Sequence, residues 1–184
     1  MRGAASKLYN LLENLLEWSR MQQGLVSFAP EKTQFFQLVE AIKPIASEPA
    51  KTKEIELTFD IPVELSVFAD SIMVQSVMRN LISNAIKFTP KGGRVSVSAK
   101  ATIDNGVEFS VHDTGIGMSP AMIDNLFRLD LPTNRKGTEG EPSTGLGLMI
   151  CKDFIDKHSG KLWVESEEGK GSIFYFTLPD KTAK

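Results

Sequence analysis

Hydrophobic and polar positions alternate at helical spacing in several stretches of this chain of 184 residues. The first stretch runs from Ser6 to Met21, and Gly24 is placed to end it. Because its apolar stripe is narrow and its length is marginal for an isolated helix, we expect it to need a partner helix. A second helix is predicted from about Thr33, where Pro44 should kink it and Pro49 should stop it.

Three further helices follow. The strongest pattern runs from Ser71 to Phe88, with a broad apolar face and Asp70 as its N-cap. Ser119-Pro120 opens a short helix, because Ser favours the cap position and Pro the first turn. The last helix covers about Gly147 to Ser159. Residues 130–143 show no periodicity and are rich in Gly, Pro, Thr and charge, which predicts a loop.

Short segments with strand-like patterns lie between these helices, and the third and fourth are joined by the hairpin signal Asp104-Asn105-Gly106. The predicted strands are Glu54 to Phe59, Leu65 to Ala69, Arg94 to Ala101, Val107 to His112, Lys161 to Glu165 and Ser172 to Leu178. The order of the elements predicts a helical stub followed by an α/β domain.

Composition and charge narrow the function classes. The 21 Lys and Arg residues against 23 Asp and Glu give a net charge of −2, so we expect no broad basic field for nucleic acid. A single cysteine, Cys151, allows no intrachain disulfide and is compatible with a reducing compartment. No apolar run approaches the roughly 20 residues of a membrane helix, so we expect no membrane contact by this chain.

The helix predicted from Ser71 to Phe88 carries an unusual polar face. Asn80, Asn84 and Lys87 fall together on the side away from its apolar residues. Asn is a poorer helix former than the Glu, Lys or Arg of an ordinary solvated face. The Asn84 amide oxygen could coordinate Mg²⁺ and Lys87 could meet a phosphate. The alternative, weighed on this face alone, is a hydrated or interhelical polar surface.

Two other motifs have both a chemical and a plain structural interpretation. Asp113 ends a strand before Gly115 and Gly117, so its carboxylate could accept the adenine amine while the glycines let the base approach the backbone. A plain turn would use the same residues. The run Thr144-Gly145-Leu146-Gly147-Leu148 leads into a helix, where backbone amides could bind phosphate, although such a run is also a routine helix start.

These motifs, with the turn Gly169-Lys-Gly171-Ser172, occur in an order that resembles the ATP-binding domain of sensor histidine kinases. That family belongs to a superfamily with gyrase, heat-shock chaperone and mismatch-repair ATPases. The resemblance covers roughly residues 6 to 179. It implies an α+β two-layer sandwich, a Bergerat-type fold in which about three helices cover one face of a mixed sheet.

The resemblance also implies ATP and Mg²⁺ as cofactors, with Asn84 as the metal ligand and Asp113 as the adenine acceptor. It implies a lid between Arg128 and Ser143, with Phe127 as the aromatic at its start. In that segment Arg128, Arg135 and Lys136 could fold over bound phosphates, or could equally be solvated loop charges. The cofactor-binding residues it assigns are Asn80, Asn84, Lys87, Asp113, Gly115, Gly117, Thr144, Gly145, Leu146, Gly147, Leu148 and Thr177.

The resemblance divides the chain into three parts. Residues 1–28 resemble the second helix of the dimerisation hairpin with its linker, 29–180 the ATP-binding catalytic domain, and 181–184 a tail. Neither His112 nor His158 lies in the stub, so we expect the acceptor histidine outside this chain and no self-phosphorylation by it. The implied partners are a response regulator or receiver domain and a second copy through the hairpin. The implied location is the cytoplasmic portion of a bacterial sensor.

Two other functions remain open at the level of sequence. One is a hydrolytic ATPase or a protein-serine kinase of the same superfamily. The other is a non-catalytic nucleotide sensor, or a degenerate domain that only makes protein contacts. Hydrolytic members place a Glu where this chain has Asn80, and an amide is no general base for water. We therefore expect slow ATP hydrolysis.

Overall fold

The computed structural model describes residues 27–103, 106–128, 135–141 and 145–179. Several predicted features lie outside these described residues, namely the helix from Ser6 to Met21 with Gly24, the hairpin residues Asp104 and Asn105, Thr144 and the tail 181–184.

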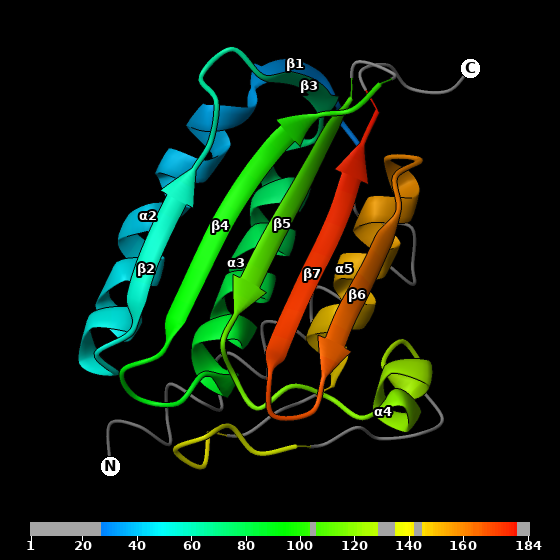
Figure 1. Ribbon diagram of the computed structural model, residues 1–184. Coiled ribbons are helices and arrows are strands. Elements are labelled where there is room, and N and C mark those ends of the chain that lie inside the picture. The colour runs from blue at the N-terminus through cyan, green and yellow to red at the C-terminus, as the bar shows by residue number, and fades with distance from the viewer. Residues whose placement is uncertain (1–26, 104–105, 129–134, 142–144, 180–184) are drawn as a thin grey trace.

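A mixed sheet of five strands forms one layer of the described domain, in the order β2-β4-β5-β7-β6 (Figure 1). β2 runs parallel to β4, and every other neighbouring pair is antiparallel. The strand bounds are β2 Glu56–Asp60, β4 Arg94–Ala101, β5 Val107–Asp113, β6 Leu162–Glu167 and β7 Gly171–Leu178. The predicted strands are thus confirmed, with ends that shift by one or two residues.

Three helices cover one face of this sheet, as Figure 1 shows: α2 (Phe35–Thr52), α3 (Ser71–Phe88) and α5 (Leu146–Lys157). The short helix α4 (Pro120–Asn125) lies beside β6. A second sheet of two strands, β1 (Glu31–Gln34) and β3 (Ser66–Ala69), flanks the start of α2. The predicted two-layer α/β fold is confirmed.

Alternation along the strands places the core between the sheet and the helices. In β5, Val107, Phe109 and Val111 are buried, whereas the residues between them face the open side of the sheet. The Phe109 ring lies 5.8 Å from the Phe35 ring of α2 and 4.8 Å from the Phe176 ring of β7. This aromatic row connects α2 to the centre of the sheet.

The expectation that Pro49 stops the second helix is wrong, because α2 continues to Thr52. Pro44 and Pro49 both lie on the exposed side of the helix. The other side of the helix is buried in the core, and its burial offsets the hydrogen bonds that proline cannot make. The buried residues are Phe35, Leu38, Val39, Ile42, Ala46 and Ala50. The strand β1 was also not predicted, since its polar sequence lacks a strand pattern.

Asp70 joins three parts of the chain at the start of α3. Its Oδ1 accepts hydrogen bonds from the backbone nitrogens of Ile72 and Met73, both at 3.1 Å, which confirms the predicted N-cap. Its Oδ2 accepts one from the Ala29 nitrogen at 3.0 Å, and its own nitrogen donates to Nε2 of the buried His158 at 2.9 Å. One side chain therefore fixes the entering chain and the helix start together.

His158 is the C-cap of α5, and burial lowers its pKa below the ordinary value. Because Nε2 accepts from Asp70, Nδ1 carries the proton and donates to the Phe154 carbonyl at 2.6 Å. The Phe28 ring packs against the imidazole in a T-shaped arrangement, with 4.9 Å between the ring centroids. His158 is thus a neutral structural residue. His112, by contrast, is exposed on the open face of the sheet.

We expect Asp70→Ala to lower the free energy of unfolding by about 1–2 kcal/mol, because it removes the cap of α3 and the anchor of Ala29. Asp70→Asn is the matched control, since Asn caps helices as well as Asp and should cost less. Urea denaturation would measure both values. Equal stability of wild type and Asp70→Ala would contradict the role given to this residue.

Candidate nucleotide-binding site

The half-buried polar face of α3 has a defined geometry. Asn84 Nδ2 donates a hydrogen bond to Asn80 Oδ1 at 3.2 Å. This bond orients the Asn84 amide, so its Oδ1 is the atom that would face a cation. A neutral oxygen of this kind fits Mg²⁺, whose remaining ligands would be phosphate oxygens and water. The described residues contain no cluster of three or more acidic, His or Cys side chains suited to a metal.

The start of α5 lies against this polar face. Gly145 is its N-cap residue, with a left-handed φ of 71° that favours glycine. A Cβ on Gly147 would lie 2.4 Å from Asn80 Nδ2, so a larger residue there would force the Asn80 side chain to move. The first backbone amides of α5 therefore stand beside Asn80, where they could bind an anion.

Asp113 ends β5 at the same end of the sheet and is only 3% exposed. Burial raises its pKa to about 6, although hydrogen bonds from the backbone at Gly115 and Ser172 oppose the shift. The Gly115 nitrogen donates to Asp113 Oδ1 at 2.8 Å. A buried carboxylate at a strand end is suited to accept hydrogen bonds from an adenine amine.

The glycines around Asp113 are required by contacts within the protein. A Cβ on Gly115 would lie 2.5 Å from the Phe88 carbonyl oxygen at the end of α3. Gly117 has a φ of 59°, and a Cβ there would lie 1.9 Å from the Glu167 carbonyl oxygen. Gly171 has a φ of 100° and packs equally closely on the Asp113 backbone. These glycines let the backbone around Asp113 lie close to the ends of α3 and β6 and to the start of β7. This packing is a second reason for glycine here, besides the predicted access for a base.

The described part of the predicted lid, residues 135–141, is bound to the same structure. Arg135 Nη1 donates to the Gly117 carbonyl at 2.7 Å, and the Thr138 nitrogen donates to the Lys87 carbonyl at 3.1 Å. Thr138 Oγ1 also donates to the Thr89 carbonyl at 3.1 Å. Figure 1 shows this segment at the end of the sheet where α3 and β5 end and α5 begins.

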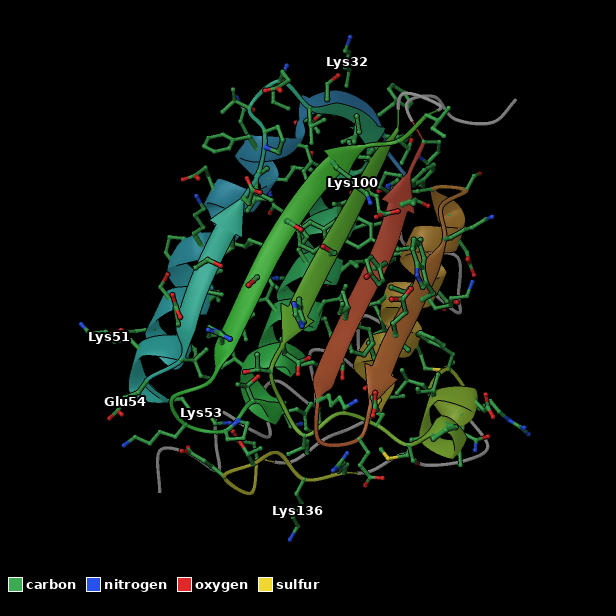
Figure 2. All side chains as sticks on the ribbon, in the orientation of Figure 1. Lys32, Lys51, Lys53, Glu54, Lys100 and Lys136 are labelled. Atoms are coloured by element: carbon green, nitrogen blue, oxygen red, sulfur yellow. The ribbon has the colours of Figure 1, made fainter. Side chains whose placement is uncertain are left out.

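The predicted lid cations differ in position. Lys136 is exposed and points away from the molecule in Figure 2, so the alternative of a solvated loop charge fits it in this structure. Arg128 is also exposed, and Phe127 packs partly against the core. Lys87 is half-buried, and burial lowers the pKa of its ammonium while the Glu141 carboxylate opposes the shift.

Thr177, which the resemblance assigns to nucleotide binding, does not lie near Asp113 in the structure. It pairs with Glu108 near the far end of β7, whereas Asp113 pairs with Ser172. Five residues of strand separate the two positions, roughly 17 Å. Thr177 Oγ1 instead accepts a hydrogen bond from the Lys161 nitrogen at 3.0 Å. Ser172 is the hydroxyl residue of β7 beside Asp113, and its Oγ lies 2.9 Å from Ser166 Oγ. The turn that opens β7 therefore also contributes to the site.

A family model described as histidine kinase-, DNA gyrase B- and HSP90-like ATPase matches residues 69–182. The chain belongs to this family, and its relatives place it among the ATP-binding catalytic domains of sensor histidine kinases. None of the helices within the described ranges has both the length and the apolar character needed to cross a bilayer.

One relative is the adaptive-response sensory kinase SasA of Synechococcus elongatus, 30% identical over 183 residues that cover 97% of this chain and 46% of that protein. The corresponding kinase of Prochlorococcus marinus subsp. pastoris is 37% identical over 132 residues, which are 70% of this chain and 35% of that protein. The chain thus spans less than half the length of these curated relatives.

Among solved structures, the catalytic domain of the histidine kinase ThkA is 28% identical with a TM-score of 0.71, covering 84% of this chain and 97% of that chain. Full-length ShkA in complex with AMPPNP is 27% identical with a TM-score of 0.80 and covers 99% of this chain and 38% of that chain. The fold and the sequence therefore agree on the family.

We expect Asp113→Asn to raise the free energy of unfolding at neutral pH. The folded-state pKa of Asp113 is about 6 against an ordinary 3.8, so the folded protein binds more protons between these values and stability falls as pH rises through them. The amide removes this penalty, on the order of 1–3 kcal/mol near pH 8 and less near pH 4.5. Thermal unfolding at both pH values would measure it. Asp124→Asn, an exposed carboxylate on α4, is the control and should change neither value. A gain independent of pH would refute the explanation.

Proposed function

We propose that this site binds Mg²⁺-ATP. Asp113 holds the adenine amine, Asn84 contributes an oxygen to the metal, and Lys87 with the first amides of α5 contacts the phosphates. The observation that supports this most strongly is that two other motifs and the described part of the predicted lid meet at α3, which carries the Asn80–Lys87 motif. Gly147 touches Asn80, Gly115 touches the end of α3, and Thr138 is bound to the Lys87 carbonyl.

We further propose that the chain donates the γ-phosphoryl group of ATP to a histidine on a helical hairpin, for relay to the aspartate of a response regulator. Phosphoryl transfer depends mainly on charge neutralisation and in-line positioning. When bound, Mg²⁺ supplies charge neutralisation at the phosphates. Lys87 and the α5 amides add positive charge from the protein, while Asp113 fixes the base and so the direction of the phosphate chain.

Relatives support the class of partner. ShkA was solved with AMPPNP, an ATP analogue. ThkA was solved in complex with the response regulator TrrA, in a structure 23% identical to this chain, so the likeness there is one of fold. We propose the same class of partner for this chain, together with a homodimer through the hairpin and a position in the cytoplasmic portion of a bacterial sensor.

We expect Asn84→Ala to weaken binding of AMPPNP roughly 10-fold in the presence of Mg²⁺ and far less in EDTA, because the proposed metal ligand matters only when the metal is bound, whereas the lost hydrogen bond to Asn80 affects both conditions equally. Calorimetric titration under both conditions would measure this. Ser83→Ala, an exposed neighbour on α3, is the matched control and should bind as wild type does. Equal losses with and without Mg²⁺ would show that Asn84 is not a ligand.

We also expect the chain to phosphorylate a separately supplied hairpin of a related histidine kinase, with slow hydrolysis in its absence because Asn80 is no general base. Labelled ATP and acid-labile label on the hairpin would report the transfer. A hairpin with its histidine replaced by glutamine is the control. Fast phosphate release without transfer would favour a hydrolytic ATPase, and binding without either reaction would favour a nucleotide sensor.

A further inference from the structure

Three polar side chains lie opposite one another across three strands at the edge of the candidate site. Asp113 of β5 pairs with Ser172 of β7, and Ser172 pairs with Ser166 of β6. Opposite residues in antiparallel strands face the same side of the sheet, so all three face the side that the helices cover. Figure 1 shows that β5 ends, and the turn from β6 to β7 lies, at the same end of the sheet. Asp113 and Ser172 are buried there, and Ser166 is half-buried.

The Ser166 hydroxyl connects two separate parts of the chain. Its Oγ accepts a hydrogen bond from the Met118 nitrogen at 2.9 Å, which fixes the end of the loop between β5 and α4. It also lies 2.8 Å from the Gly171 carbonyl oxygen and 2.9 Å from Ser172 Oγ. One hydroxyl therefore holds the loop that follows the candidate adenine acceptor together with the first two residues of β7.

The hydrogens of this network can be assigned by elimination. A carbonyl oxygen only accepts, and two oxygens 2.8 Å apart need a hydrogen between them, so Ser166 donates its one proton to Gly171. In the bond between the two hydroxyls, Ser172 is then the donor. Ser166 Oγ accepts from Met118 and from Ser172, which uses both of its lone pairs. Because the proton of Ser172 is taken in this way, its oxygen can only accept a hydrogen bond from any further group.

This order of protons leaves hydrogen-bond acceptors beside the candidate base site. The Ser172 backbone donates to the Asp113 carboxylate, so the Ser172 hydroxyl and the carboxylate are neighbours on one side of the sheet. Both offer lone pairs. An amine could donate to such a pair of groups, whereas a carbonyl oxygen would meet only other acceptors. A Ser172 hydroxyl that could turn would lose this discrimination, because it could then donate as well.

We propose that Ser166 is a positioning residue for recognition of the base, because it fixes the Ser172 hydroxyl as an acceptor beside Asp113 and holds the loop that follows. This inference rests on the proposed function and deepens it. It differs from a purely structural role for Ser166, because it assigns to this residue a preference for a base edge that donates, as the adenine amine does. Its effect on binding should therefore depend on the amine of the ligand, and not on the sugar or the phosphates.

The test compares Mg²⁺-ADP with Mg²⁺ and the diphosphate of purine riboside, which differs from ADP only in lacking the amine. Both ligands are titrated calorimetrically into wild type, Ser166→Ala, Ser172→Ala and the double variant. We expect Ser166→Ala to weaken ADP binding about 5-fold, while the affinity for the analogue changes less than about 2-fold. Ser172→Ala should show a similar loss. The double variant should lose no more than either single variant, because both residues act through one acceptor.

Two further variants control for packing. Ser166→Thr keeps the hydroxyl and should retain the preference for ADP. Ser98→Ala is the matched control and should bind both ligands as wild type does, because Ser98 Oγ lies 2.7 Å from Ser110 Oγ in a second cross-strand serine pair, on the open face of the sheet. Thermal unfolding would show whether Ser166→Ala folds. If it does not, Ser166→Cys replaces it, because the thiol keeps the shape but is a weak donor and acceptor.

Equal losses for ADP and the analogue in Ser166→Ala, or unchanged ADP binding, would overturn the positioning role and leave the proposed function standing. A double variant that loses the sum of the two single losses would do the same, since the two residues would then act independently. Equal affinity of wild type for ADP and the analogue would overturn the adenine contact proposed for Asp113, and this inference with it. Failure of wild type to bind either ADP or AMPPNP would overturn the whole proposed function.

Discussion

Four consecutive carbonyls at the end of α3 need hydrogen bonds that the helix itself cannot supply, and the site is assembled by the groups that provide them. Lys53 donates to the carbonyls of Ile86 and Lys87, and Thr138 to those of Lys87 and Thr89. The Ile116 nitrogen donates to the carbonyl of Phe88 at 3.1 Å. The end of α2, the segment before α5 and the turn after Asp113 thus meet at one helix terminus. Unsatisfied backbone groups at this terminus would be costly, so the same requirement that completes the fold gathers the candidate ligands.

The site also lowers the stability of the fold at one position. Asp113 is buried at the end of a strand, and its raised pKa means that the charged carboxylate is destabilised at neutral pH. Hydrogen bonds from the backbone offset only part of this cost. A residue selected for stability alone would not carry a charge there. A ligand that donates a hydrogen bond to the carboxylate would explain the buried charge, and the adenine amine of the proposed function is such a donor. Functional sites often lower the stability of the fold in this way.

Sequence reasoning predicted α3 to the residue, because a broad apolar face and a capping Asp70 are both local signals. Local signals also predicted that Asp113 ends a strand and that a helix begins near Gly147, as the structure shows. It missed the continuation of α2 past Pro49, since burial of Ala50 is a tertiary effect. Lys53 carries no local signal at all, because its importance comes from carbonyls 33 and 34 residues away and a carboxylate 88 residues away. Thr177 was instead assigned to the site by resemblance, but the strand register places it at the end of the sheet away from Asp113.

Asn80 links the packing of the site to the choice of reaction. Its side chain lies under Gly147 and accepts from Asn84, so it supports both the start of α5 and the orientation of the proposed metal ligand. A carboxylate at this position could still accept from Asn84, but it would add negative charge where phosphates are expected to bind. It would also offer a base for water. An amide does the packing without either effect. An amide at position 80 therefore agrees with the proposed transfer of the γ-phosphoryl group to an acceptor other than water. Because Gly147 has no side chain, the Asn80 amide can lie between α3 and α5.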